Sequence, residues 1–329
     1  MLMEDGYKFH VQFHITNRCN LRCSHCYEGE CSQKVDWDFL DFKEAIDKLW
    51  SCFKIWGVKG EISLIGGEPT LHPHFYEMLD YLRGRGDVHG ISVLTNGTLV
   101  NEKFISQIKK NDCFVQVSID GVNAETHDAI RGNGNYAKTT ANVKRMSESG
   151  IDVSVHYVLS KNTTPLNDTF FETAHNLGVQ QITFSRLVPF GNATVDKMMS
   201  KEETKAAFEF ISKKKKEFEN RGLFVATTRP LWCNIGYEGK CPVAHQTITI
   251  LENGDVYPCR RLPIKLGNIK QDSFLEIWYT NPVLEDLRNR TRINTCGSCQ
   301  HLDNCGGARC IAYAFFGDYM ASDPQCWII

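Results

Sequence analysis

Short hydrophobic runs alternate with longer amphipathic stretches between about residues 9 and 188 of the chain. The runs are rich in β-branched and aromatic residues, and they predict six strands at residues 9–16, 61–65, 91–95, 114–119, 153–159 and 182–187. Apolar residues at helical spacing predict helices at residues 36–55, 75–83, 102–110, 136–149 and 167–177. Because strands and helices alternate, we expect repeated βα units and a mostly parallel sheet.

The remainder of the chain has a different pattern. Residues 201–220 predict one amphipathic helix, and residues 247–251 and 255–257 predict a hairpin around Asn253-Gly254. Residues 273–290 predict one or two further helices. Eight of the 14 cysteines lie from Cys233 onward. We therefore expect a core over residues 1–200, a connecting helix over 201–225 and a cysteine-rich unit over 226–329.

Composition and charge narrow the class of protein. The net charge of -2 offers no chain-wide positive field for nucleic acid, and no apolar stretch of about 18 residues is present to cross a membrane. The first residues lack the features of a signal peptide. We expect a soluble, cytoplasmic protein, with neither nucleic acid nor membrane as partner. In a reducing compartment, 14 cysteines in a chain of 329 residues indicate metal ligation rather than disulfides.

Three cysteines directly follow the first predicted strand. Cys19, Cys23 and Cys26 have the spacing C-x3-C-x2-C. Three thiolates that hold an iron-sulfur cube leave one iron open to another ligand, whereas a structural zinc site requires four ligands. His25 is available as a fourth zinc ligand, so both kinds of site remain open on the motif alone.

This motif resembles the signature of the radical S-adenosylmethionine (SAM) enzymes. In that family the residue before the last cysteine is usually aromatic, and His25 departs from this. The resemblance implies that the open iron chelates SAM, that one electron cleaves the sulfonium, and that a 5'-deoxyadenosyl radical takes hydrogen from substrate. It also implies a partial (β/α)6 TIM-type barrel over roughly residues 9–187.

Further segments match the places where that family holds SAM. They follow the second, third and fourth predicted strands and include residues 127–132 beyond them, and the resemblance implies contacts there to the SAM amino, carboxylate and ribose groups. Alone, each is equally typical of a turn. The predicted cofactor-binding residues are Gly66, Gly67, Glu68, Pro69, Asn96, Ser118, Asp120 and Arg131.

The C-terminal cysteines resemble the SPASM domain, the auxiliary-cluster extension of radical SAM enzymes that modify peptides. Four residues separate Cys305 from Cys310, where the family usually has three. Carried over by position, the resemblance implies two auxiliary 4Fe-4S clusters. The first set is Cys233, Cys241, Cys259 and Cys310, and the second is Cys296, Cys299, Cys305 and Cys326.

The resemblance favours a peptide maturase that takes SAM and three 4Fe-4S clusters. Sulfatase maturases carry an aspartate after the Tyr-Pro-Cys cysteine, but Arg260-Arg261 stand there, which disfavours that activity. Expected partners are a peptide or small-protein substrate, a donor such as flavodoxin or ferredoxin, and a separate leader-binding protein. One alternative is the same radical chemistry on a porphyrin in haem biosynthesis, and another is a zinc-stabilised interaction protein. No catalytic acid or base is assigned; Arg260, Arg261, His156, Tyr157 and Arg186 are candidate substrate-facing residues.

Overall fold

The computed structural model describes residues 8–29, 35–228, 230–237 and 240–329. Within them, ten strands form one sheet in the order β10-β9-β8-β1-β2-β3-β4-β5-β6-β7. The strands are β1 (Lys8–Thr16), β2 (Lys59–Gly66), β3 (Val88–Thr95), β4 (Cys113–Ser118), β5 (Val153–Leu159), β6 (Gln181–Arg186), β7 (Phe224–Thr227), β8 (Thr247–Ile250), β9 (Asp255–Tyr257) and β10 (Gly267–Asn268). All neighbours from β8 to β7 are parallel, whereas β9 and β10 pair antiparallel. The predicted α/β fold with a mostly parallel sheet is confirmed.

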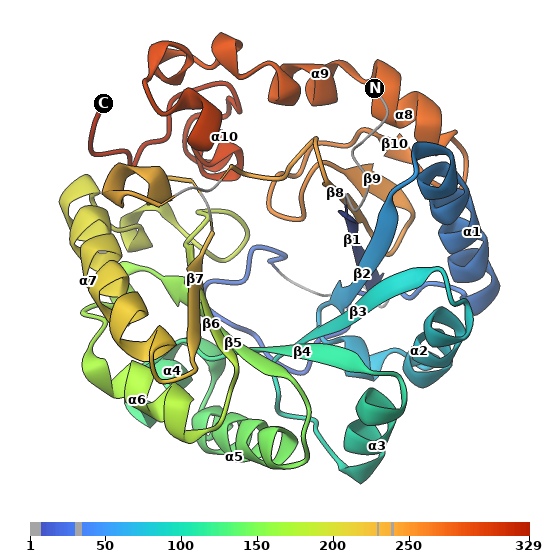
Figure 1. Ribbon diagram of the computed structural model, residues 1–329, viewed down its shortest axis with the longest axis horizontal. Helices are drawn as coiled ribbons and strands as arrows, with labels where there is room; N and C mark the ends of the chain where they lie inside the picture. The colour runs from blue at the N-terminus through green and yellow to red at the C-terminus, as the bar shows by residue number, and fades with distance from the viewer. Residues whose placement is uncertain (1–7, 30–34, 229, 238–239) are drawn as a thin grey trace.

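Helices cover the outside of this curved sheet, which forms an open ring in Figure 1. They are α1 (Phe39–Trp56), α2 (Phe75–Gly84), α3 (Glu102–Lys110), α4 (Ala124–Arg131), α5 (Asn135–Glu148), α6 (Asp168–Asn176), α7 (Lys201–Glu219), α8 (Phe274–Thr280), α9 (Pro282–Arg288) and α10 (Arg309–Phe316). The C-terminal segment with α9 and α10 occupies the side of the ring that the strands leave open (Figure 1). In the described part of the chain, no helix is long and apolar enough to span a membrane.

The six predicted strands correspond to β1–β6, with ends that differ by at most a few residues. The barrel strands continue at both edges, because β7 pairs in parallel with β6 and β8 pairs in parallel with β1. The predicted hairpin is β8–β9, and the segment predicted as one or two helices forms α8 and α9. The domain boundaries stay a prediction.

Alternation along the strands separates an apolar outer face from a polar inner one. Val11 and Phe13 of β1 are fully buried in the hydrophobic core. Gln12, between them, aligns with Ser63 of β2, which aligns with Ser92 of β3. Since successive side chains of a strand point to opposite faces, this row of polar residues faces into the barrel. The barrel interior is therefore suited to polar ligands.

The cysteine-rich part is joined to the barrel by main-chain pairing and by aromatic packing. Residues 10–13 of β1 pair with residues 247–250 of β8. The Trp37 indole nitrogen donates to the Leu251 carbonyl at 2.9 Å. Trp278 of α8 packs against Phe9 of β1 and Trp56 of α1, with ring centroids 5.0 and 5.7 Å apart. Both parts of the chain thus share one sheet and one core.

Candidate active site

A cavity lies at the carboxyl ends of β1 to β6, the edge where parallel barrels carry their sites. Its lining includes all three cysteines of the first motif, Cys19, Cys23 and Cys26. Five of the predicted cofactor-binding residues line it as well: Gly66, Gly67, Asn96, Ser118 and Arg131. The strand ends thus bring the predicted cluster residues and most predicted SAM contacts around one space.

The loop that carries the three cysteines is held by the loop that follows β6. Asn192 donates from its backbone nitrogen to the Cys26 carbonyl at 2.8 Å and from its side chain to the Cys23 carbonyl at 3.2 Å. Lys197 Nζ donates to the Ser24 carbonyl at 2.9 Å. Gly191 has a φ of +64°, and a Cβ there would stand 2.5 Å from the Cys26 carbonyl oxygen. Only glycine allows this approach without strain.

Asp120 is the fully buried hub behind the cysteine loop. Its Oδ2 accepts from His25 Nε2 and Arg131 Nε, both at 2.7 Å. Its Oδ1 accepts from the Val158 nitrogen at 2.7 Å. Burial raises the pKa of Asp120, but Arg131 and His25 lower it more, so its pKa lies well below the ordinary value. A permanent anion here orients Arg131, whose Nη1 reaches Cys23 Sγ at 3.9 Å.

Glu68 joins the ends of β2 and β3. It is fully buried, its Oε1 accepts from Thr95 Oγ1 at 2.8 Å and from Thr70, and its Oε2 accepts from the Asn96 nitrogen at 2.8 Å. Burial outweighs these bonds and raises its pKa. Glu68, Pro69 and Asp120 are not among the residues that line the cavity. In the structure they lie behind the lining residues and support them. Direct contact of these three with SAM stays a prediction.

Asp120 engages Nε2 of His25 at 2.7 Å, which leaves only Nδ1 of that imidazole for a metal ion. Among the described residues, no three His, Cys, Asp or Glu side chains converge tightly enough to hold a single metal ion. A cubane is larger than one ion, and three thiols around one cavity fit its three-thiolate mode of binding. The donor set therefore fits an iron-sulfur cluster, which leaves one iron open toward the cavity, better than it fits zinc.

Basic groups line another part of the cavity. Arg186, Arg260, Arg261 and His156 are among its lining residues, and their contact with a substrate stays a prediction. Burial, and then Arg260, lower the pKa of His156 to about 3, so its imidazole is neutral at pH 7. Tyr157 points away, because it is fully buried in the core and donates to the Thr163 carbonyl.

Two residues beside this wall escaped the sequence analysis. Glu28 lines the cavity, and its Oε1 lies 3.5 Å from Nδ1 of the buried His14. Burial and Glu252 raise the pKa of Glu28 to about 7, while burial and Arg260 lower the pKa of His14 to about 3. The period-two pattern of β1 was the available signal for His14, since it places that residue on the inner face.

The C-terminal cysteines gather in two places. Cys296, Cys299, Cys305 and Cys326, the predicted second set, line one small hollow together. Cys241, Cys259 and Cys310 all lie close enough to Arg261 to interact with its charge. The Cys233 thiol donates to Asn234 Oδ1 at 3.4 Å and lies close enough to Cys305 for the two thiols to shift each other's pKa, so in the structure it lies beside the second set. The assignment of Cys233 to the first set stays a prediction.

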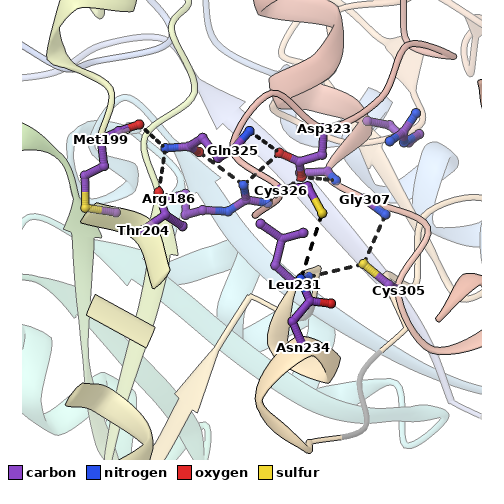
Figure 2. Close-up of polar contacts among 12 residues, drawn as sticks. Arg186, Met199, Thr204, Leu231, Asn234, Cys305, Gly307, Asp323, Gln325 and Cys326 are labelled. Atoms are coloured by element: carbon purple, nitrogen blue, oxygen red, sulfur yellow. Dashed lines mark hydrogen bonds and ion pairs between the residues drawn. The ribbon is translucent and has the colours of Figure 1, made fainter. Parts of the chain in front are cut away.

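A buried ion pair connects the cavity wall to the second set (Figure 2). Both terminal nitrogens of Arg186, at the end of β6, donate to the Asp323 carboxylate at 2.9 and 2.7 Å. Asp323 also accepts from the Ala308 nitrogen at 2.8 Å, and the Gly307 nitrogen donates to Cys305 Sγ at 3.3 Å. Gln325 donates to the Met199 carbonyl from the same segment. This network fixes the Cys305 loop against the barrel.

Two family descriptions match the parts of this site. "Radical SAM superfamily" matches residues 13–170, and the SPASM "Iron-sulfur cluster-binding domain" matches residues 241–300. The chain belongs to the radical SAM enzymes with a SPASM domain. SAM and 4Fe-4S clusters, auxiliary clusters among them, are therefore the cofactors of this enzyme. The alternative of a zinc-stabilised protein without radical chemistry is wrong.

Relatives of this radical SAM enzyme carry two kinds of name. The AdoMet-dependent heme synthase of Methanosarcina barkeri is 29% identical over 96% of this chain and 95% of its own length. The mycofactocin maturase MftC of Mycobacterium ulcerans is 27% identical over 96% of this chain and 87% of its own length. The names of these relatives thus divide between a heme synthase and a maturase, and they do not determine the substrate of this enzyme.

Solved structures of the same fold cover nearly the whole chain. anSMEcpe with bound AdoMet superposes with a TM-score of 0.79 at 17% identity, over 97% of this chain and 90% of that one. SuiB bound to its precursor peptide SuiA gives a TM-score of 0.78 at 17% identity, over 98% of this chain and 76% of that one. At this identity the likeness establishes the fold: a radical SAM barrel followed by a SPASM region.

Proposed function

We propose that this enzyme reductively cleaves SAM to a 5'-deoxyadenosyl radical and oxidatively modifies or crosslinks a peptide or small protein, as RiPP maturases do. Three 4Fe-4S clusters, one at Cys19, Cys23 and Cys26 and two in the C-terminal part, supply the electron that cleaves SAM and accept electrons from the oxidised substrate. The chain itself positions SAM and substrate and excludes water.

The observation that carries this proposal is the full set of eight auxiliary cysteines. Seven of them gather as two groups, four around one hollow and three around Arg261. Four thiolates are the usual ligand set of a 4Fe-4S cluster, so eight cysteines suffice for two auxiliary clusters. According to the family resemblance, two such clusters are typical of peptide maturases.

The names of relatives agree with a peptide substrate. MftC is called a maturase, and a related protein from Bacillus subtilis, 29% identical over 84% of this chain, is called a subtilosin bacteriocin biosynthesis protein. The solved structures include SuiB with the precursor peptide SuiA and anSMEcpe with the peptide Cp18Cys. We further propose that a flavodoxin or ferredoxin donates the electron, that a separate protein presents any leader peptide, and that the enzyme works in the cytoplasm.

The test is a substrate search with anaerobically reconstituted enzyme, SAM and a reductant. Short peptides encoded beside the gene are each incubated with the enzyme, and mass spectrometry follows 5'-deoxyadenosine and the peptide. We expect one peptide to lose two hydrogen atoms in proportion to the 5'-deoxyadenosine formed. A matched reaction with the Cys19, Cys23 and Cys26 alanine variant should yield neither product. Cleavage of SAM that never changes any of these peptides counts against a peptide maturase.

A second candidate function is haem biosynthesis, in which the same radical acts on a porphyrin side chain. The specific observation in its favour is the heme synthase relative, which aligns over 96% of this chain and 95% of its own length. The basic lining of the cavity also suits a substrate with carboxylate side chains. A porphyrin absorbance change on mixing with the enzyme, and loss of carbon dioxide from the porphyrin, would favour this function.

A further inference from the structure

Five arginines line the cavity, against a single carboxylate residue, Glu28, in its described lining. Most of this positive charge is already engaged by the protein. Arg131 pairs with Asp120, and Arg186 pairs with Asp323. Arg22 donates to the carbonyls of Cys19 and Leu21 at 2.8 Å. Arg261 faces cysteines of the first auxiliary group.

Arg260 differs from Arg131 and Arg186, which pair with carboxylates, and from Arg22, which donates to backbone carbonyls. In the described part of the chain, no carboxylate oxygen lies within 4.0 Å of its guanidinium. Its contact is the ring of Tyr27, whose centroid is 5.7 Å away. A guanidinium that lies over an aromatic face keeps its edge donors available for a planar, two-oxygen partner. Arg260 therefore presents to the cavity a positive charge that no direct ion pair engages, while Glu28 lies near enough for this charge to lower its pKa.

Two neutral histidines lie within electrostatic reach of Arg260. Arg260 lowers the pKa of both His14 and His156, after burial, which shows that its charge is felt at both rings. His156 lines the cavity. His14 is 1% exposed, and its buried Nε2 has no hydrogen-bond partner among the described residues. His156 thus offers a neutral imidazole to the cavity that Arg260 lines, whereas His14 is not among the lining residues.

We propose that Arg260 binds a carboxylate of the substrate and holds it in the cavity beside SAM. The carboxylate is either an aspartate or glutamate side chain of a peptide or an acidic side chain of a small molecule such as a porphyrin. The inference rests on the proposed function only in that a substrate must share the cavity with SAM. Arg260 is thus a specificity-determining residue, and a neutral substrate analogue binds poorly.

The carboxylate of SAM itself is assigned to another arginine. Arg131 is fixed by Asp120 beside Cys23, where the family resemblance places the SAM carboxylate. Arg260 instead follows Cys259 in the loop after β9. Substitution of Arg260 is therefore expected to leave SAM affinity unchanged, and this separates the two anion sites experimentally.

The test measures binding to the reconstituted full-length enzyme with SAM present. The probes are coproporphyrin III with its uncharged tetramethyl ester, and two synthetic peptide pools that differ only in a central Asp or Asn. Wild type is compared with Arg260→Gln, Arg260→Glu and Arg260→Lys. Arg145→Gln is the control, because Arg145 pairs with Glu102 on the outer face. SAM binding to every variant is measured by equilibrium dialysis.

We expect wild type to prefer one acidic probe over its uncharged partner. Arg260→Gln should weaken that binding about tenfold or more, Arg260→Glu should weaken it further, and Arg260→Lys should retain part of it. SAM affinity should be unchanged in every Arg260 variant. The control Arg145→Gln should bind SAM and all probes as wild type does. Porphyrin binding that depends on Arg260, with no preference between the peptide pools, would uphold this inference and count against a peptide maturase. Equal binding of every acidic probe to wild type and Arg260→Gln would overturn the inference.

Discussion

Gly191 stands where the loop after β6 meets the loop that carries Cys19, Cys23 and Cys26. Its left-handed φ of +64° and the carbonyls of Cys26 and Tyr27, each 2.5 Å from a would-be Cβ, leave no room for a side chain. Arg131, Asp120 and Asn192 support the same loop through hydrogen bonds. Single residues thus decide whether the three thiols keep their positions.

Gly191→Ala should displace the cysteine loop. Strain at a left-handed position and a backbone clash are expected to cost about 1–3 kcal/mol of stability. Iron should fall by about four atoms per chain, with loss of SAM binding. Gly84→Ala is the control, because a Cβ at Gly84 meets nothing within 4 Å. Iron analysis and urea denaturation check both variants, and full iron content in Gly191→Ala would contradict the assigned role.

His127, which contacts the Arg131 partner Asp120, should make the stability of the protein depend on pH. It is fully buried, and its Nδ1 accepts from the Asp120 nitrogen at 3.2 Å, so the imidazole must be neutral. Burial and then Arg131 lower its pKa to about 4. Between pH about 6.5 and about 4 the unfolded chain binds a proton that the folded chain does not, so stability falls as pH falls through this range.

We expect His127 to contribute a slope of about 1.4 kcal/mol per pH unit over that window. Urea denaturation at pH 5 to 7 should show stability rising with pH, and His127→Gln should make that rise shallower. His89→Gln, at an exposed position of β3, serves as the comparison. An unchanged slope in His127→Gln would show that this histidine is not held neutral.

At the scale of elements, the β8 strand decides how the two parts of the chain are joined. It extends the barrel sheet in parallel register with β1, and α8 packs its Trp278 against Phe9 and Trp56. The sheet and core therefore continue across the predicted domain boundary. Unfolding of the barrel and of the cysteine-rich part should be coupled.

Trp278→Ala should destabilise the whole molecule by about 3–5 kcal/mol, as expected for loss of a large buried aromatic ring. Trp278 is 3% exposed, whereas its neighbour Tyr279 is 58% exposed, so Tyr279→Ala should cost no more than about 1 kcal/mol. Denaturation followed by fluorescence and by cluster absorbance should show one coincident transition in both variants. Separate transitions would mean that the two parts unfold independently.

The strands and helices show which features of the fold can be predicted from local sequence patterns. The strands β1–β6 and all the helices between them except α4 were predictable, because each buries one face and so repeats its apolar residues at a fixed period. The features that were not predicted include α4 and α10, the four-residue strand β7, and the parallel pairing of β8 with β1. Pairing of strands more than 230 residues apart leaves no local pattern, because their contact depends on the complete sheet.

The residues of the candidate site also divide into those that local motifs predict and those that they do not. Its cysteines and the Gly66, Asn96, Ser118 and Arg131 positions follow from motifs at strand ends, and the structure brings them around one cavity. The roles of Gly191 and Asp323 were not predicted. Each depends on an approach between distant segments, and neither residue belongs to a recognisable local motif.

For the whole molecule, the Arg186–Asp323 pair is the polar connection between the barrel and the second auxiliary group. Arg186 is 2% exposed and Asp323 is 2% exposed. Burial lowers the pKa of Arg186, but the Asp323 charge raises it more, so the net pKa is raised and the pair stays ionised. Loss of one partner would leave the other as a buried, uncompensated charge.

Arg186→Met should therefore lower stability by about 3–5 kcal/mol and loosen the Cys305 loop. Arg221→Met is a matched control, because Arg221 makes the same two-nitrogen contact with Glu172 at the surface. That surface pair should contribute no more than about 1 kcal/mol. Urea denaturation and the reduction potentials of the auxiliary clusters check both. Unchanged stability and unchanged cluster potentials in Arg186→Met would show that the Arg186–Asp323 pair neither stabilises the protein nor holds the Cys305 loop in place.

The most direct test of the central claim is iron and sulfide analysis of anaerobically reconstituted wild type beside the variant with Cys19, Cys23 and Cys26 changed to alanine. The account predicts about twelve irons per wild-type chain and about eight in the variant, which should also lose SAM binding. Equal iron content in the two proteins, or SAM binding that persists in the variant, would contradict it.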